Sequence, residues 1–191
     1  ATSWRMRRLD VLPLKKLRNP ARHLRALAKW PERIVGQLPD ARDLAGERFW
    51  NFKVSVFSKL VEPPHATMEA RRACIAAIFA AAEAVERSEK RPKNCRVACL
   101  VTTPCLFESE VTLFFDDDYF LTFLPPAEKS RIEYSGGWVE GEAADLESVS
   151  DQIPPAPEGL AFHGGVRLRE FDEAWGRESE RVTWVWAFPF R

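Results

Sequence analysis

The stretch CRVACLVTTPCLFESEVTLFF, residues 95–115, decides more of the fold than any other part of the chain. Its first part is a nearly continuous run of apolar side chains, which is typical of a central strand covered on both faces. Its last part alternates, with Val111, Leu113 and Phe115 on one side, which predicts a second strand with one buried face. We therefore expect a sheet whose centre is buried.

A strand and a helix precede this stretch. Residues 49–57, FWNFKVSVF, alternate apolar and polar side chains, so they predict a strand with one buried face. Residues 67–88 predict a long alanine-rich helix, with Thr67 as its N-cap. The apolar face of this helix repeats at helical spacing and consists of Ile75, Ile78, Phe79 and Ala82.

The segment after the central strands is acidic and then irregular. The stretch VTLFFDDDYFLTF, residues 111–123, predicts two strands joined by a tight acidic turn, because aspartates bond turn amides. Residues 124–159 are interpreted as irregular, with short helices at AEKSRIEY and DLESVSDQ and a turn at Gly136 and Gly137. Two further strands, GGVRLREFD and RVTWVWAF, close the chain.

The first 36 residues predict a basic helical arm. Asn19 is a plausible N-cap, Pro20 suits the first helical position, and Leu24 and Leu27 lie on one apolar stripe that leads to Trp30. We expect this stripe to dock on the rest of the protein, a single domain over residues 37–191. The fold class predicted is α+β, a mostly antiparallel sheet packed by one long Ala-rich helix.

Composition narrows the functional classes. No apolar run approaches a membrane span, and the first residues resemble no signal peptide, so we expect a cytoplasmic protein. The four cysteines lack CxxC spacing, which favours reduced thiols over disulfides. The net charge of zero hides an asymmetry: residues 1–48 carry twelve Lys or Arg against five Asp or Glu, whereas residues 108–191 carry seven against eighteen.

The central pattern resembles a family of uncharacterised bacterial proteins, a domain of unknown function. An aromatic strand, here FWNF at residues 49–52, is followed by a helix and by a strand that ends in Pro104. An element of the type (W/F)-x-S-(Q/E)-(I/V) comes next, here residues 107–111. The resemblance covers roughly residues 48–124. It implies the fold and a bacterial origin, and it carries no activity.

Motifs for enzymatic chemistry are absent from the sequence, which has no GxxxxGK[ST], GxGxxG, HExxH or GxSxG. His163, beside two glycines, is the best candidate for a site histidine, although a loop histidine without a special role explains it as well. An alternative is a metal-dependent enzyme acting on a nucleotide or nucleic acid, with Glu108, Glu110 and Asp116 holding Mg²⁺ or Mn²⁺.

The leading hypothesis is a non-enzymatic binding protein whose partner is another protein, with nucleic acid as the less favoured partner and no cofactor. In its specific form this is an immunity protein that neutralises a basic toxin, because an acidic surface steers basic partners. The predicted partner-binding residues are Asp116, Asp117, Asp118, Trp138, Glu140, Glu142 and Asp145.

Overall fold

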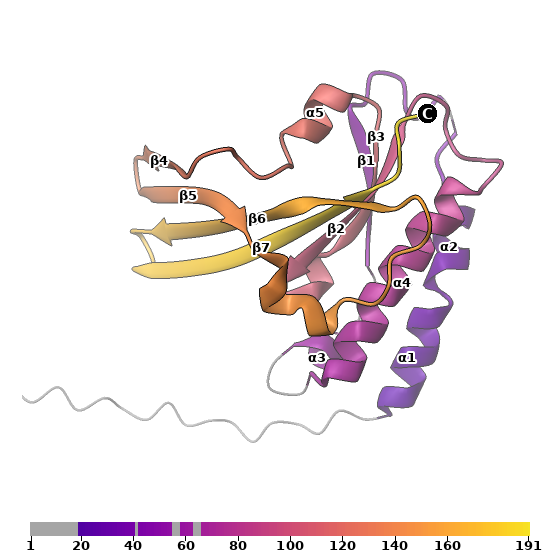
Figure 1. Ribbon diagram of the computed structural model, residues 1–191, viewed down its shortest axis with the longest axis horizontal. Helices are drawn as coiled ribbons and strands as arrows, with labels where there is room; N and C mark the ends of the chain where they lie inside the picture. The colour runs from indigo at the N-terminus through magenta and orange to yellow at the C-terminus, as the bar shows by residue number, and fades with distance from the viewer. Residues whose placement is uncertain (1–18, 41, 55–57, 63–65) are drawn as a thin grey trace, which may run out of the picture.

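A computed structural model describes residues 19–40, 42–54, 58–62 and 66–191 of the chain. Its centre is a seven-stranded antiparallel sheet in the order β1-β3-β2-β7-β6-β5-β4 (Figure 1). The fold class is therefore α+β with an antiparallel sheet, as predicted. The strands are β1 Phe49–Lys53, β2 Arg96–Thr103, β3 Glu110–Phe114, β4 Ser130–Tyr134, β5 Gly137–Ala144, β6 Ala161–Asp172 and β7 Arg177–Ala187.

Helices cover one face of this sheet (Figure 1). The longest, α4 Met68–Glu86, begins at Thr67, whose side chain accepts a hydrogen bond from the amide of Ala70. The sequence predicted that this one helix packs on the sheet. In the structure several helices share the layer with it. The other helical elements among the described residues are α1 Pro20–Ala28, α2 Trp30–Gly36, α3 Ser58–Val61, α5 Asp117–Leu121 and the 3-10 turns η1 Leu106–Glu108 and η2 Leu146–Gln152.

The main core lies between α4 and the middle strands. Ile75 and Ile78 of α4 and Val97 and Leu113 of the sheet are completely buried. Residues at alternate positions of β2 point into this core, and Cys99 points the same way as Cys95. Burying one such side chain contributes roughly 1.5–3 kcal/mol, so this contact dominates the stability of the fold.

The basic arm contains two helices. The helix that starts at Pro20, as predicted, ends at Ala28, and α2 begins at Trp30 with Pro31 in its first turn, where the missing amide hydrogen costs nothing. Asn19 caps α1 by accepting a hydrogen bond from the amide of Arg22. Leu27 and Trp30 are buried in the main core, as expected for the apolar stripe.

The basic side chains of the arm do not pair with the acidic half among the described residues, where no ion pair involves Arg22, Arg25, Lys29 or Arg33. Residues 1–18 lie outside the described residues. The division into an arm, 1–36, and a domain, 37–191, stays a prediction.

The predicted hairpin over residues 111–123 is wrong in its second half. The aspartates begin α5: Asp116 caps the helix by accepting a hydrogen bond from the amide of Tyr119, and the next two lie in the first turn. Carboxylates are favoured there because the helix dipole is positive at its N-terminus. The aromatic residues after them follow a helical period, since Phe120 is buried on the sheet while Leu121 is 57% exposed.

The segment 124–159 is also more regular than predicted. AEKSRIEY forms no helix; its second half is β4, which joins β5 through a two-residue turn at Ser135 and Gly136. Arg131 and Glu133 alternate with Ile132 along β4, a period of two that suits a strand. DLESVSDQ forms the 3-10 element η2, and the turn before Trp138 is present as predicted.

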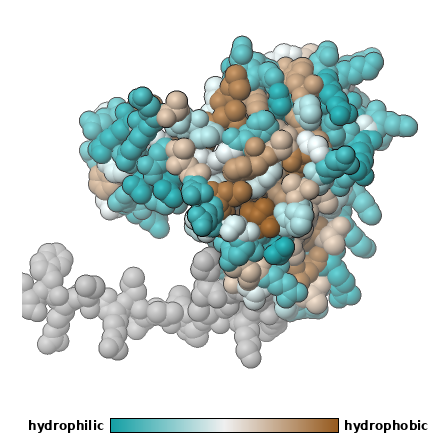
Figure 2. All heavy atoms as spheres, in the orientation of Figure 1, coloured by the Kyte–Doolittle hydropathy of each residue, from teal (hydrophilic) through white to brown (hydrophobic). Residues whose placement is uncertain are grey.

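The far end of the sheet projects beyond the helices (Figure 1). We call residues 130–142 and 167–181 the projecting end; they belong to β4, β5 and the distal parts of β6 and β7. Figure 2 shows that this end is mostly hydrophilic, while the most hydrophobic side chains gather near the middle of the molecule. All five residues of β4 are exposed.

Candidate functional site

The second face of the sheet carries a groove. Helices α1, α2 and α4 pack on the first face, whereas among the described residues α5 and the segment after it cover part of the second, through a small core around Phe114 and Phe120. Beside this small core lies an open groove of about 720 Å³. We call it the open-face groove; it is lined by Lys53, Leu100, Thr102, Phe107, Glu108, Glu110, Thr122, Phe123, Val166, Leu168, Arg181 and Thr183.

The floor of the groove is made by the sheet itself. Leu100 on β2 pairs with Val185 of β7, and Thr183, two residues away, pairs with Thr102. Because alternate residues of a strand share a face, the same face of β6 presents Val166 and Leu168. The floor therefore combines three aliphatic side chains with those of two threonines.

The rim comes from segments outside the central strands. Phe107 in η1 is 38% exposed, and Phe123 follows α5 and packs edge-on against Phe114. Two aromatic side chains thus flank this floor. Aromatic residues are enriched where proteins bind one another, since they bury a large area with few rotatable bonds.

The polar groups of the floor have hydrogen-bond partners within the chain. The hydroxyls of Thr102 and Thr183 lie 3.3 Å apart, and the amide of Thr102 donates to the buried Ser109 hydroxyl at 2.9 Å. The carboxylate of Glu110 accepts from the Asn51 side-chain amide at 2.8 Å and from the Thr112 hydroxyl at 3.1 Å. These groups shape the floor and hold it rigid.

The charged residues at the margins differ from those of the floor. Lys53, Arg181 and Glu108 are exposed, and none of them takes part in an ion pair among the residues that the structure describes. The groove thus has a floor of aliphatic and hydrogen-bonded polar side chains and exposed charges at its margins.

The predicted acidic residues on α5 are paired with arginines. Asp116 contacts Arg48, whose Nε lies 2.8 Å from the carboxylate, and Asp117 receives two hydrogen bonds from Arg96 at 2.8 and 2.9 Å. The hydrogen bond from Arg48 lowers the pKa of the Asp116 carboxyl, and that from Arg96 lowers the pKa of Asp117. Asp118 is exposed on the first turn of α5.

The predicted acidic residues on β5 belong to a ring of ion pairs. Three cations and three carboxylates alternate on the helix-side face of the projecting end. Its closest contacts are Lys129 to Glu140 at 2.6 Å, Arg169 to Glu180 at 2.9 Å and Arg167 to Glu142 at 3.0 Å. Contacts of 3.5–3.8 Å close the ring. The hydrogen bond from Arg167 lowers the pKa of Glu142.

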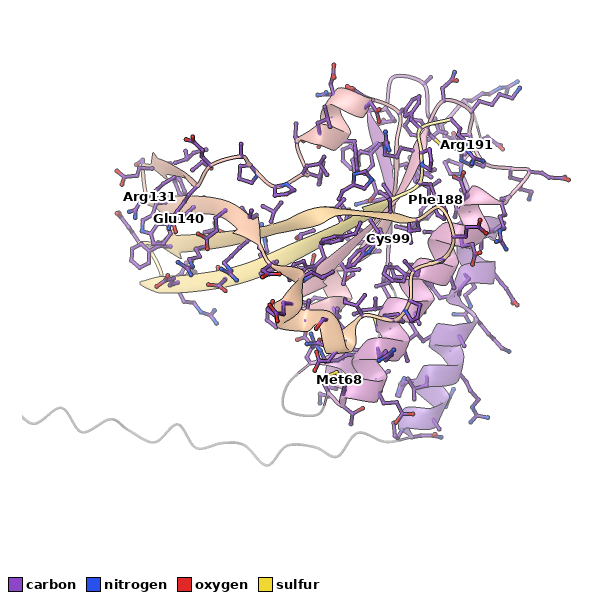
Figure 3. All side chains as sticks on the ribbon, in the orientation of Figure 1. Met68, Cys99, Arg131, Glu140, Phe188 and Arg191 are labelled. Atoms are coloured by element: carbon purple, nitrogen blue, oxygen red, sulfur yellow. The ribbon has the colours of Figure 1, made fainter. Side chains whose placement is uncertain are left out.

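The seven predicted partner-binding residues therefore do not form one patch. Asp116–Asp118 lie on α5, whereas Glu140 and Glu142 lie in the ring and Asp145 caps η2 by accepting from the amide of Glu147. Trp138 lies on the same strand face as Glu140 and stacks on Phe171, with Arg131 over its ring at 4.4 Å. Figure 3 shows Arg131 and Glu140 together at the projecting end.

The three predicted metal ligands do not come together: Glu108 and Glu110 both line the open-face groove, whereas Asp116 lies apart from them at the start of α5. Glu110 begins β3 and Asp116 follows its end, so about 20 Å of extended strand lies between them at ~3.3 Å per residue. Within the described ranges no group of three or more His, Cys, Asp or Glu residues could hold a metal ion.

His163 and the cysteines lie outside the groove. His163 packs edge-on against Phe120, and its pKa is lowered by burial and by the nearby positive charge of Arg96. All four cysteines are free thiols. Burial raises the pKa of Cys74 to about 12, so this thiol is not a reactive nucleophile at neutral pH.

Sequence reasoning missed the open-face groove because no local motif encodes it. Its lining comes from strands that are distant in the chain, and it exists only because α5 leaves the middle of this face uncovered. The sequence offers one signal for it. In a strand, alternate side chains of residues 96–102 and 181–187 point away from the main core, toward the second face of the sheet.

Comparison with known proteins identifies the family. Residues 28–184 match the family model described as "Protein of unknown function (DUF3916)", so the chain belongs to this family. The match extends well beyond the residues 48–124 on which the resemblance was based. The bacterial origin stays a prediction. The chain has no significant match among curated proteins or among solved structures. No helix in the described part of the chain is long and apolar enough to cross a membrane.

Proposed function

We propose that this chain is a non-enzymatic binding protein that takes a protein partner in the open-face groove. The observation that carries the proposal is the composition of the groove: three aliphatic side chains on its floor, two aromatic side chains on its rim, and two floor hydroxyls that are bonded to one another. A floor of this kind favours the burial of a partner's apolar side chain over proton transfer or nucleophilic attack.

The size of the groove supports a protein partner. A volume of about 720 Å³ in an open depression accommodates several side chains of a partner segment. The exposed charges of Lys53, Glu108 and Arg181 stand at its margins, where they can select partners at little desolvation cost.

In its specific form, the proposal is that the partner is a basic toxin and that the chain neutralises it. Residues 108–191 carry a large excess of acidic residues, which would speed the encounter with a basic protein. Four of the originally predicted contact residues, Asp116, Asp117, Glu140 and Glu142, are engaged within the chain. The contact is therefore proposed at the groove, with Glu108 beside it.

The test uses the product of a toxin-like gene adjacent to the gene for this chain. Calorimetry should show binding to the purified wild-type chain, and the toxin's activity should fall on mixing. Leu168→Arg, which places a charge on the groove floor, should weaken binding at least tenfold while the fold is retained by circular dichroism.

The matched control is Leu121→Arg. Leu121 is 57% exposed on α5, outside the groove, so the same substitution there should leave binding unchanged. Equal binding by wild type and Leu168→Arg would refute the groove as the site. Neighbouring gene products that neither bind nor are inhibited would refute the toxin-neutralising form.

A further inference from the structure

We propose that β4 is a dimerisation edge that pairs with β4 of a second copy of this chain, in antiparallel register about Ile132. β4 is the last strand of the sheet, and its outer edge has no neighbouring strand. Figure 1 shows it at the far end of the molecule, away from the helices. An uncovered edge strand presents free backbone amides and carbonyls that another strand can bond.

The sequence of β4 is complementary to itself. In antiparallel pairing about Ile132, Arg131 of one copy lies opposite Glu133 of the other, and the reverse contact is generated by the twofold axis. Within the chain these two side chains are 3.3 Å apart at their closest atoms and 46% and 74% exposed. The two side chains thus form an ion pair with each other, and because both are exposed, each can exchange this partner for the opposite charge of the second copy.

The opposite face of β4 supplies the apolar contact. Ile132 is 67% exposed, which makes it the most exposed large aliphatic side chain among the described residues. In the proposed register the two copies of Ile132 lie side by side at the axis. Tyr134, which is 46% exposed, lies opposite Ser130 of the second copy.

Protective edge strands have a different composition. Edges that avoid pairing carry charged side chains, proline or a bulge, so that a second copy is repelled or cannot bond. β4 has neither proline nor a bulge, and its charges are opposite in sign and spaced by two residues. With that spacing, each charge of one copy lies opposite a charge of the other sign in the second copy, so the two strands attract each other.

Such a dimer has a geometric consequence. A twofold axis through paired edge strands is perpendicular to the sheet, so both copies present the same sheet face on the same side. The two open-face grooves would then lie on one side of a continuous sheet. This arrangement would bind a repeated or dimeric partner with increased avidity.

The experiment measures the mass of the full chain by sedimentation at concentrations from about micromolar to about millimolar. The wild type should shift from monomer to dimer. Glu133→Arg places arginine opposite arginine, and Arg131→Glu places glutamate opposite glutamate, so each should weaken the dimer at least tenfold. The double variant R131E/E133R restores opposite charges and should restore the dimer.

Control variants change the same charges elsewhere. Glu89→Arg and Lys93→Glu lie in the exposed turn after α4 and should leave the dimer unchanged. Circular dichroism checks that every variant is folded. A wild type that stays monomeric throughout the range overturns the proposal. So does a dimer that survives both single reversals, or a double variant that remains as weak as the single ones.

Discussion

The covered half of the molecule and its projecting end use one sheet in two different ways. In the covered half, Trp184 is 1% exposed, and its indole Nε1 donates to the Thr103 hydroxyl at 3.1 Å. At the projecting end, Trp138 is only half-buried, with Phe171 on one side and Arg131 over its ring. One tryptophan is held by a packed core and the other by its strand neighbours.

The difference shows what a helix layer contributes to a sheet. Where α4 covers the strands, apolar burial fixes the register and the stability. Where no helix lies over them, cross-strand pairs and the ring of ion pairs must hold the register, and exposed pairs contribute only ~0–1 kcal/mol each. We therefore expect the projecting end to be the less stable part of the sheet and the part that is free to contact partners.

The strongest test of this comparison is a tryptophan series. Trp184→Ala should lower the free energy of unfolding by about 3–5 kcal/mol, because it leaves a cavity in the main core. Trp138→Ala should cost about 1 kcal/mol through the lost ring contacts. Trp175→Ala, at a position 80% exposed, should stay within about 0.5 kcal/mol. Urea unfolding followed by circular dichroism measures all three, and equal costs for Trp184 and Trp138 would contradict the comparison.

A second test asks whether the basic arm belongs to the covered half. Leu27 is 4% exposed in the main core, so Leu27→Asp should cost at least the roughly 1.5–3 kcal/mol that its burial contributes. Arg25→Glu, on the exposed side of the same helix, should change the stability by about 0.5 kcal/mol or less. The two melting temperatures measure the difference. If both variants have the melting temperature of the wild type, the arm contributes nothing to the stability of the fold.

The smallest expected effect concerns the ring of ion pairs at low pH. The hydrogen bond from Arg167 places the folded pKa of Glu142 below its ordinary value of 4.5. The carboxylate therefore stabilises the fold above pH 4.5, and this contribution is lost as the pH falls through the lower, folded value. Glu142→Gln should melt slightly below the wild type at pH 7, and the two curves should converge in acid. If the difference between the two melting temperatures stays constant from pH 7 to pH 3, the ionisation of Glu142 does not contribute to the stability of the fold.

Local patterns in the sequence predicted those elements in which one face is clearly apolar. The period of α4, the alternation of β1 and the continuous apolar run of β2 each match a single type of burial. The prediction that β3 has one buried face is wrong, because α5 and the residues after it also cover its second face around Phe114. The sequence also predicted the N-caps Asn19 and Thr67, because a short polar side chain before a helix accepts a hydrogen bond from a free amide of the first turn.

The predictions failed where one local signal fits two structures. Three aspartates suit a turn and the N-terminus of a helix equally well. The helix α5 forms here because it brings Phe120, and Phe123 after it, into contact with Phe114. β4 has no buried face at all, so no apolar pattern marked it, and only its pairing with β5 made it a strand.

The candidate sites divide in the same way. The sequence by itself determined that residues 108–191 are acidic, that the signatures of common enzymes are absent and that the sheet is antiparallel with a buried centre. Only the tertiary structure decided that Asp116, Asp117, Glu140 and Glu142 bond to arginines and lysine of their own chain, and that the groove lies on the other face. Charge and periodicity are properties of neighbouring residues, whereas pairing and exposure depend on strand register and on which face the helices cover.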